Sequence, residues 1–268
     1  MEREDVFMEL CEFARHFPSA AIGFSGGVDS AYLLYIGLRE GADWKPVYIC
    51  SVFQPAFELE DAKRICVMLG AELTILEVDV LSYKTVQANP SDRCYHCKHI
   101  LFSHITEWAK EQGIPLVLDG SNASDAPEDR PGMRAVKELG IRSPLREAGL
   151  TKAMIRKLSR EAGLFTWNKP AYACLATRVP SGTPIDKDIL KKVDLSEAAL
   201  REMGFSDFRV RLMQNAAKLQ LTRDQLGTAI QKREQIINTL KPYFSEVLLD
   251  LKERPGIEFP IPAEKEAD

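Results

Sequence analysis

A glycine turn between an apolar strand and an apolar helix most limits how this 268-residue chain can fold. Residues Ala20–Phe24 predict a buried strand, Ser25–Ser30 (SGGVDS) predicts the turn, and a helix is expected from about Asp29 through Ile36. Backbone N–H groups in such a turn, in front of the positive end of a helix, form a site for phosphate oxygens. We therefore expect Ser25–Ser30 to bind phosphate.

The residue types in this turn suit an anion. Gly26 and Gly27 allow positive φ and a close approach, and the hydroxyls of Ser25 and Ser30 can donate further hydrogen bonds, while Asp29 can hold a metal or cap the helix. The Gly-Lys-Ser/Thr ending of a Walker A loop is absent. The turn resembles the SGGxDS signature of PP-loop ATP pyrophosphatases, which cleave ATP to AMP and pyrophosphate while adenylating a substrate. An ordinary βα turn is the alternative interpretation.

The first half of the chain alternates strand and helix patterns. This alternation predicts an α/β fold with a parallel sheet and helices on both faces. Ligands bind such sheets at the carboxyl ends of the strands, where the segments after Phe24, Val52 and Asp119 would meet. Besides 20–24, the expected strands are 46–52, 73–80 and 116–119, and the expected helices are 58–69 and about 97–112.

Beyond Pro144 the pattern changes. Thr151 predicts the N-cap of a helix that ends at Gly163, and a long irregular segment follows from Trp167 to Pro184. Loops of this length without regular structure are functional or disordered, and the aromatic, Cys and Arg content here favours function. We expect a first domain over residues 1–166 and a small α+β domain over 167–268. Its helices are predicted at 187–203 and 224–240, and its strands at 208–213, 218–221 and 246–250.

Composition limits the partners of the chain. The chain has 35 Lys and Arg residues against 39 Asp and Glu residues, which gives a formal net charge of −4. This charge argues against nucleic-acid binding through a basic surface that extends over the whole protein. The residues Met1–Val6 lack a basic leader followed by an apolar core, and no apolar run is long enough for a membrane span. We expect a cytoplasmic protein with no membrane partner.

Six cysteines in the cytoplasm are expected to be thiols, metal ligands or redox groups rather than disulfides. Cys94 and Cys97 form a Cys-x-x-Cys pair near a helix start, which can bind a metal or cluster edge or act as a redox pair. A structural zinc site needs four ligands, and the sequence contains no second Cys-x-x-Cys pair to complete one. Cys174 lies in the irregular segment near two cations, so three cysteines could hold three irons of a 4Fe-4S cluster and leave one iron open.

Taken together, these segments resemble the LarE family, the pyridinium-3,5-dicarboxylate mononucleotide sulfur transferases that help to build a nickel-pincer cofactor. The resemblance runs over nearly the whole chain. It rests on the segments 25–30, 93–98, 118–122, 129–132, 168–183, 204–205 and 208–211. It implies ATP and Mg²⁺ as cofactors, a pyridinium dicarboxylate mononucleotide as substrate, and homo-oligomers that include hexamers.

In this family the cysteine at the Cys174 position supplies sulfur. Some members sacrifice it and leave dehydroalanine, whereas others hold a [4Fe-4S] cluster with an extra sulfide on three cysteines. With Cys94, Cys97 and Cys174 present, this chain fits the second pattern. The expected reaction adenylates a substrate carboxylate and then replaces AMP by sulfur. The physiological sulfide donor stays open.

Several further residues are candidates for substrate binding. Arg178, Arg209 and Arg211 carry guanidinium groups that match phosphate and carboxylate oxygens, although a solvated strand face is the alternative for the last two. The resemblance implies that Tyr95 stacks on the pyridinium ring and that Glu197 occupies an acidic position of the site. The acidic loop residues Asp125, Glu128 and Asp129 can bind a metal or substrate, or can simply be solvated.

Three other functions compete with this interpretation. A PP-loop tRNA thiolase also combines the loop with three cluster cysteines, but usually carries zinc-ribbon or basic RNA-binding modules. An amide-forming PP-loop enzyme would not need the three cysteines. A non-catalytic nucleotide-binding or metal-storage protein would not turn ATP over to AMP.

Overall fold

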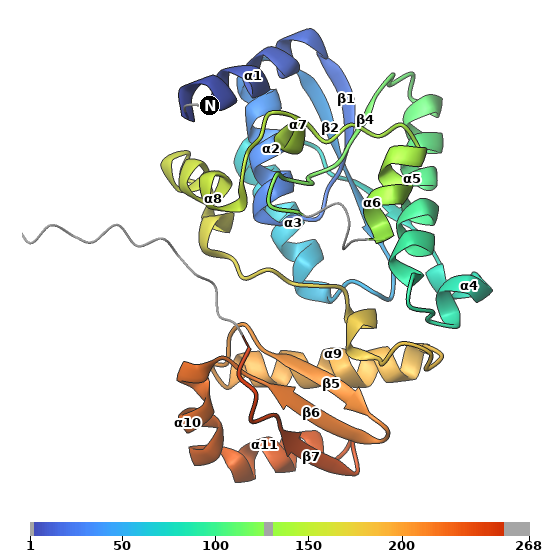
Figure 1. Cartoon of the computed structure of the whole chain (residues 1–268), viewed down its shortest axis with the longest axis vertical. Helices are drawn as coiled ribbons and strands as arrows, with labels where there is room; N and C mark the ends of the chain where they lie inside the picture. The colour runs from blue at the N-terminus through green and yellow to red at the C-terminus, as the bar shows by residue number, and fades with distance from the viewer. Residues whose placement is uncertain (1–2, 126–130, 255–268) are drawn as a thin grey trace, which may run out of the picture. The chain divides into compact units, whose positions relative to one another are not determined.

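The computed structural model describes residues 3–125 and 131–254, which form two compact units (Figure 1). The first unit contains Met1–Lys169 and Ala173–Asp194, and the second contains Pro170–Tyr172 and Leu195–Asp268. The expected boundary after residue 166 stays a prediction. The candidate residues Glu128 and Asp129 lie outside the described residues.

A parallel four-stranded sheet organises the first unit, as the alternation of patterns predicted. Its order is β3-β2-β1-β4, and Ile22 of β1 pairs with Pro46 of β2 and Leu118 of β4. Since all four strands run the same way, the phosphate loop after β1 and the segment after β4 emerge at one edge of the sheet. The strands are β1 (Ser19–Gly23), β2 (Asp43–Cys50), β3 (Thr74–Glu77) and β4 (Val117–Leu118).

Helices cover both faces of this sheet (Figure 1). Helix α2 packs on β1 and β2 beneath an outer layer of helices, and α5 packs on the other face with α6 outside it. No helix in the described part of the chain is long and apolar enough to cross a membrane. The helices are α1 (Arg3–His16), α2 (Val28–Arg39), α3 (Ala56–Leu69), α4 (Lys84–Gln87), α5 (Arg93–Glu111), α6 (Pro131–Glu138), α7 (Pro144–Glu147) and α8 (Lys152–Glu161), with short 3-10 turns at Val80–Ser82, Phe165–Asn168 and Leu175–Arg178.

The helix boundaries follow local capping chemistry. The Thr151 hydroxyl accepts a hydrogen bond from the Met154 N–H at 3.3 Å, as expected of the N-cap of α8. Helix α5 begins at Arg93, earlier than the expected start near Cys97. Both cysteines of the Cys-x-x-Cys pair therefore lie on the first turns of this helix.

The second unit is a small three-stranded α+β fold. Strand β5 (Arg209–Met213) pairs antiparallel with β6 (Ala216–Gln220) across a tight turn in which Gln214 has a φ of 56°. Strand β7 (Glu246–Leu249) pairs parallel with β6. Its helices are the later part of α9 (Lys187–Glu202), α10 (Arg223–Gln231) and α11 (Arg233–Leu240).

The single helix predicted over residues 224–240 is wrong, because the backbone leaves the helical conformation at Lys232. Its φ and ψ are −92° and 11°, so this residue ends α10 and begins α11. The Lys232 ammonium donates to the Met203 carbonyl at 2.6 Å, which fixes the break against the end of α9.

The packing of α2 onto β2 requires a glycine. A Cβ on Gly37 would lie 2.2 Å from the Cε3 atom of the Trp44 ring, and Trp44 is only 1% exposed. The Trp44 indole N–H donates to the Phe17 carbonyl at 2.8 Å, so the ring cannot easily move aside. The absent side chain at Gly37 therefore sets how closely the helix of the phosphate loop approaches the sheet.

We predict that Gly37→Ala lowers the free energy of unfolding by about 1–3 kcal/mol, because the new methyl overpacks a rigid ring. Gly227→Ala is the matched control, since Gly227 also lies within a helix but a Cβ there meets nothing within 4 Å. Its helix should gain up to about 1 kcal/mol. Urea unfolding of both variants measures the difference, and equal stability of the two would contradict this account of the packing.

Candidate functional site

Hydrogen bonds of two serine hydroxyl groups connect the two ends of the phosphate loop (Ser25–Ser30). Ser25 and Ser30 face each other across the turn with their Oγ atoms 3.2 Å apart, and the Ser25 N–H donates to the Ser30 Oγ at 3.3 Å. The Gly27 N–H donates to the Ser25 Oγ at 3.3 Å. Helix α2 begins at Val28 with Gly27 as its N-cap and with no side-chain cap. The first N–H groups of α2 therefore point out of the helix end as donors for an anion.

Gly26 is required by the backbone. Its φ of 67° lies in the left-handed region, and a Cβ there would sit 2.9 Å from the backbone of Ala62 on α3. A side chain at this position would clash with a helix backbone, which cannot shift cheaply. The loop is therefore pressed against α3, and Gly26 lets the chain turn there.

Asp29 is held by two neighbours from other parts of the chain. Its carboxylate accepts a hydrogen bond from the Asn122 amide at 3.4 Å and forms an ion pair with the Lys152 ammonium at the start of α8. Burial raises the pKa of the Asp29 carboxyl, and the Lys152 charge opposes that shift. Lys152 thus places a cation beside the phosphate loop.

A second cation reaches the same loop from the irregular segment. The Lys169 ammonium lies 3.4 Å from the Gly26 carbonyl and 2.7 Å from a carboxylate oxygen of Asp61 on α3. Its side chain is 15% exposed, so this charge is held in place rather than solvated. Two ammonium groups therefore contact residues of the loop.

The segment after β4 lies against the start of α2. A Cβ on Gly120 would come within 3.1 Å of the Ser30 nitrogen, which shows how near the two backbones run. The neighbouring Asp119 is buried and accepts hydrogen bonds from the hydroxyls of Ser121 at 2.5 Å and Ser143 at 2.6 Å. The Lys98 ammonium is 3.8 Å from the same carboxylate. Lys98 directly follows Cys97, so this ion pair connects the cysteine helix with the strand end.

Cys174 is brought to the cysteine helix by two buried side chains. The Arg93 guanidinium donates to the Asn89 side-chain oxygen at 2.6 Å, to the Ala176 carbonyl at 2.9 Å and to the Cys94 sulfur at 3.7 Å. The Asn89 amide donates to the Pro180 carbonyl at 2.8 Å and to the Thr183 carbonyl at 3.0 Å. We call Asn89 and Arg93 the loop clamp, because they bind the backbone on the C-terminal side of Cys174.

Two further contacts fix the residues beside Cys174. The Leu175 N–H donates to the Phe53 carbonyl at 2.9 Å, in the segment that follows β2. Arg178 is 1% exposed and donates to the Ala173 carbonyl at 2.9 Å and to the Thr177 hydroxyl at 2.7 Å. Arg178, a predicted phosphate or carboxylate ligand, thus also shapes the turn that carries Cys174.

The three thiols share one electrostatic environment. Burial, together with the neighbouring Cys174 and Cys94, raises the pKa of the Cys97 thiol to about 12, and Arg93 opposes the shift. Burial also raises the pKa of Cys174, where Arg93 again opposes it and Cys94 adds to it. Cys94 itself is exposed, so the group can be reached from solvent.

The structure holds no metal ion or cluster, so the residues themselves are compared with the predicted cluster. Within residues 3–125 and 131–254, no three His, Cys, Asp or Glu side chains converge on a point where one metal ion could bind. An iron–sulfur cluster binds its thiolates through different irons, so its ligands need to surround a volume rather than a point. Cys94, Cys97 and Cys174 have the right chemistry and interact electrostatically, and their role as cluster ligands stays a prediction.

Tyr95 already has partners on α6. Its hydroxyl donates to a Glu138 carboxylate oxygen at 2.6 Å, and the Arg134 guanidinium lies 3.8 Å from the centre of its ring. The hydrogen bond to Glu138 raises the pKa of the Tyr95 hydroxyl. The ring is thus held beside Cys94, with Arg134 over one face.

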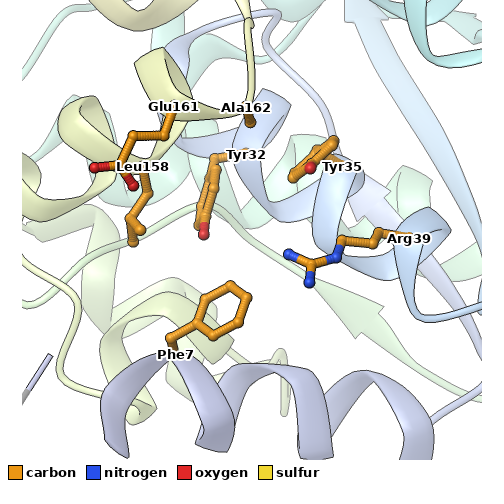
Figure 2. A pocket seen from close by; sticks show the side chains of 7 residues that line it. All are labelled: Phe7, Tyr32, Tyr35, Arg39, Leu158, Glu161 and Ala162. Carbon is orange, nitrogen blue, oxygen red and sulfur yellow. The ribbon is translucent and has the colours of Figure 1, made fainter. Parts of the chain in front are cut away.

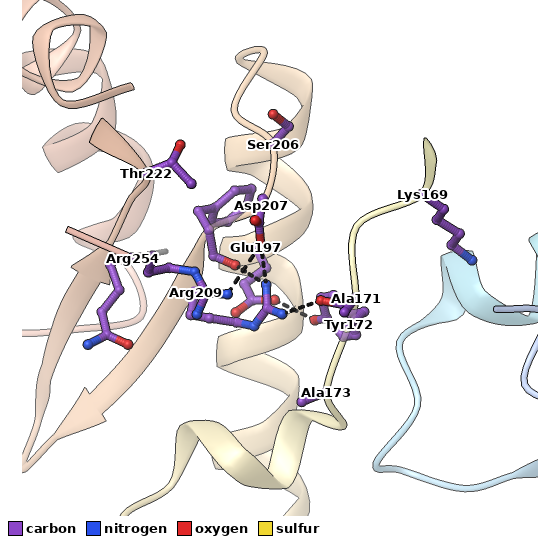
Figure 3. A network of polar contacts seen from close by, with 12 residues as sticks. Lys169, Ala171, Tyr172, Ala173, Glu197, Ser206, Asp207, Arg209, Thr222 and Arg254 are labelled. Atoms are coloured by element: carbon purple, nitrogen blue, oxygen red, sulfur yellow. Dashed lines mark hydrogen bonds and ion pairs between the residues drawn. The ribbon is translucent and has the colours of Figure 1, made fainter. Parts of the chain in front are cut away.

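The remaining predicted residues, Glu197, Arg209 and Arg211, lie in the second unit. Figure 3 shows Glu197 and Arg209 with the residues that they contact. Glu197 is fully buried and accepts hydrogen bonds from the Val210 N–H at 2.9 Å and from the Tyr172 hydroxyl. Arg209 is buried and donates to the Ala171 carbonyl at 2.6 Å. Arg211 is half-buried and donates to the Gln220 side chain at 2.5 Å. Their predicted contact with substrate stays a prediction.

A separate hollow of about 430 Å³ lies along the side of α2 (Figure 2). None of the predicted site residues belongs to its described lining, which is mainly aromatic and aliphatic. The hollow and the phosphate loop are therefore different places on the same helix. The lining consists of Phe7, Tyr32, Tyr35, Arg39, Leu158, Glu161 and Ala162.

Two of the cations and the clamp were not predicted from the sequence. Lys98 and Lys152 were not predicted as site residues, whereas Lys169 was expected as one of the two cations near Cys174. Each of the three is placed by a contact with a distant carboxylate. One local signal existed for Asn89: an Asn-Pro pair marks a turn, and Asn89 indeed has a positive φ of 54°. The residues next to Asn89 gave no indication of which groups its side-chain amide would bind.

Comparison with known proteins identifies relatives over most of the chain. An uncharacterised protein of Synechocystis is 34% identical over 257 residues, which cover 93% of this chain and 94% of that protein. The pyridinium-3,5-bisthiocarboxylic acid mononucleotide synthase of Lactiplantibacillus plantarum is 32% identical over 233 residues, 86% of this chain and 84% of the synthase. The tRNA-specific 2-thiouridylase MnmA of Thermotoga petrophila is 26% identical over 190 residues, 55% of this chain and 53% of that enzyme. No family model matches the chain.

We predict that Asn89→Gly lowers the free energy of unfolding by about 1–3 kcal/mol, because it removes the buried hydrogen bonds of the loop clamp while glycine tolerates the positive φ. Gln214→Gly is the matched control, since Gln214 also has a positive φ but is exposed in a hairpin turn. It should change stability by less than about 0.5 kcal/mol. Urea unfolding with a fluorescence readout measures both. A loss as large for Gln214→Gly would show that the clamp contributes nothing specific.

Proposed function

This chain belongs to the LarE family of PP-loop enzymes, and from that premise we propose that it transfers sulfur to the carboxylates of pyridinium-3,5-dicarboxylate mononucleotide at the expense of ATP. The observation that carries the proposal is the gathering of Cys94, Cys97 and Cys174 by the loop clamp, in the unit that also holds the phosphate loop. Adenylation and sulfur delivery would then occur in one site.

Adenylation is the first step of the proposed reaction. A substrate carboxylate oxygen attacks the α-phosphorus of ATP, the bond to the pyrophosphate oxygen breaks, and an acyl adenylate forms. Negative charge builds up on the departing pyrophosphate, and the N–H groups at the start of α2 are oriented to receive it. Lys152 and Lys169 supply positive charge beside them. Mg²⁺ would spread the same charge, and Asp29 is the carboxylate of the loop suited to hold it.

Sulfur transfer is the second step. A sulfur nucleophile attacks the carbonyl carbon of the acyl adenylate, the bond to AMP breaks, and a thiocarboxylate remains. In one route the sulfur is a sulfide. In the other it is the Cys174 thiolate, which gives a thioester, and removal of the Cα proton of Cys174 then breaks its Cβ–S bond and leaves dehydroalanine.

The residues of this chain favour the sulfide route. When held by Cys94, Cys97 and Cys174, a [4Fe-4S] cluster would have one iron without a protein ligand and would supply the sulfide there. Arg93 would offset the negative charge of the three deprotonated thiols, because its guanidinium opposes the rise in pKa that burial causes at Cys97 and Cys174. If Cys174 were simply a sacrificial sulfur donor, the reaction would not require Cys94 or Cys97.

Substrate binding is assigned to the remaining predicted residues. Arg178, Arg209 and Arg211 are proposed to bind the phosphate and carboxylates of the mononucleotide, Tyr95 to stack on its ring, and Glu197 to hold Val210 and Tyr172 in place. The sequence adds a cytoplasmic location to the proposal, and the family resemblance adds assembly into a homo-oligomer, with a hexamer as one form.

A [4Fe-4S]-dependent tRNA thiolase is the second candidate function. It is favoured by the similarity to the 2-thiouridylase of Thermotoga petrophila, which extends over 55% of this chain. The excess of acidic over basic residues weakens it, because phosphate backbones attract basic surfaces. Incubation with ATP and either tRNA or the mononucleotide separates the two, according to which substrate acquires sulfur.

We predict that replacing Cys94, Cys97 or Cys174 by Ala abolishes sulfur transfer and leaves AMP formation within threefold of wild type. The physical reason is that these thiols serve the second step alone. Cys50→Ala is the matched control, since Cys50 is a half-buried thiol on β2 and should retain both steps. Anaerobic turnover with ATP and the mononucleotide, followed by mass spectrometry of the products, measures this. Full sulfur transfer by the Cys94 and Cys97 variants would instead support the sacrificial route.

We predict that Lys152→Met raises the KM for ATP at least tenfold, because it removes an ammonium group from beside the phosphate loop. Lys157→Met on the same helix is the matched control, since Lys157 is exposed and should leave KM unchanged. Pyrophosphate release at increasing ATP concentration gives both values. An unchanged KM for Lys152→Met would remove Lys152 from the nucleotide site.

A further inference from the structure

The hollow along α2 lies within the first unit and apart from the predicted site (Figure 2). Its volume of about 430 Å³ lies in the range of pockets that hold small molecules. Its described lining comes from three helices, with Phe7 on α1 and the other residues on α2 and α8. All three helices belong to one unit, so the hollow is a property of that unit alone.

Aromatic rings supply much of this lining. The centroids of the Tyr32 and Tyr35 rings lie 6.1 Å apart, and the two ring planes are tilted by 34°. The Arg39 guanidinium lies 5.2 Å from the centroid of the Phe7 ring. Offset and edge contacts between aromatic rings add to the stabilisation that burial of their surface provides. The lining therefore favours a ligand with a planar aromatic ring.

The Tyr32 hydroxyl is a buried donor that none of the described residues uses. Tyr32 is only 1% exposed, and its hydroxyl forms no hydrogen bond with any residue that the structure describes. Figure 2 shows this hydroxyl directed into the space between α2 and Phe7. Burial raises the pKa of Tyr32, so the hydroxyl stays protonated and can donate. A buried hydroxyl without a hydrogen bond lowers stability, so an acceptor that enters the hollow gains from binding it.

Two opposite charges border Tyr32. Figure 2 shows Arg39 on one side of the Tyr32 ring and Glu161 on the other. Both charges act on the Tyr32 hydroxyl, because Arg39 opposes the rise in pKa that burial causes and Glu161 adds to it. The ion pair of Arg39 with Glu40 is long, at 3.9 Å, and the Arg39 side chain is 49% exposed. Its guanidinium can therefore still bind a carboxylate through two parallel hydrogen bonds.

We propose that this hollow binds a small aromatic zwitterion, which is a planar ring with a carboxylate at one end and a cationic group at the other. The carboxylate accepts hydrogen bonds from the Arg39 guanidinium and the Tyr32 hydroxyl. The ring packs against Tyr35 and Phe7, and the cationic group faces Glu161. A second carboxylate in place of the cation meets the negative charge of Glu161, so dicarboxylates bind less well. This inference does not rest on the proposed sulfur transfer.

Three probes of similar size test the charge pattern on the full-length chain. The zwitterion is para-(aminomethyl)benzoate, terephthalate has a carboxylate in place of the cationic group, and benzylamine lacks the carboxylate. Ligand-observed NMR titration gives a Kd for each probe. We expect saturable binding of para-(aminomethyl)benzoate and at least fivefold weaker binding of the other two, because each of them loses one charged contact. Absence of saturable binding, or equal affinity for all three probes, overturns the proposal.

Variants show whether the zwitterion binds in this hollow. Arg39→Met should raise its Kd at least fivefold and Tyr32→Phe at least twofold, whereas Glu161→Gln should reduce the preference for it over terephthalate at least threefold. Arg64→Met is the matched control, since Arg64 is also exposed and lies 3.9 Å from the centroid of the Phe165 ring, but does not belong to the described lining. Its Kd should stay within twofold of wild type. An unchanged Kd in Arg39→Met, or an equal rise in Arg64→Met, overturns the proposal.

Discussion

A buried arginine holds together the two segments that carry Cys94 and Cys174. Arg93 binds the side chain of Asn89 on one side and the carbonyl of Ala176 on the other, while lying against the sulfur of Cys94. A buried guanidinium without such partners would cost several kcal/mol, so the backbone around Cys174 and the start of α5 stabilise each other through it. The proximity of the three thiols follows from this contact.

Ion pairs with carboxylates hold two lysines against the phosphate loop and a third lysine against the end of β4. Lys152 is paired with Asp29, Lys169 with Asp61 and Lys98 with Asp119. Such pairs keep ammonium groups in place at little net gain in stability, because desolvation offsets their attraction. In the proposed reaction, the triphosphate of ATP would be a further partner for Lys152 and Lys169.

Sequence alone predicted the parts of the fold that local chemistry decides. The strand, glycine turn and helix around Ser25–Ser30 were predicted from adjacent residues, and Thr151 caps its helix through its own hydroxyl. The parallel sheet followed from the alternation of patterns. The gathering of Cys174 with Cys94 and Cys97 was a hypothesis that rested on residue type and family resemblance.

The missed features depend on contacts between distant residues. Asn89 binds backbone carbonyls more than 90 residues later in the chain. Every residue has a backbone carbonyl, so the sequence does not indicate which ones Asn89 will bind. Lys152 meets Asp29 across 123 residues, so nothing near either one revealed the pair. The break at Lys232 depends on the Met203 carbonyl in the same way.

The central claim is that one site adenylates a carboxylate and then gives it sulfur. The most direct test is anaerobic turnover of the wild-type protein with ATP and pyridinium-3,5-dicarboxylate mononucleotide, followed by mass spectra of the products and of the intact chain. We expect AMP, a thiocarboxylate product and an unchanged polypeptide mass. Loss of H₂S from the chain at Cys174 would contradict the sulfide route, and the absence of both AMP and thiocarboxylate would contradict the claim itself.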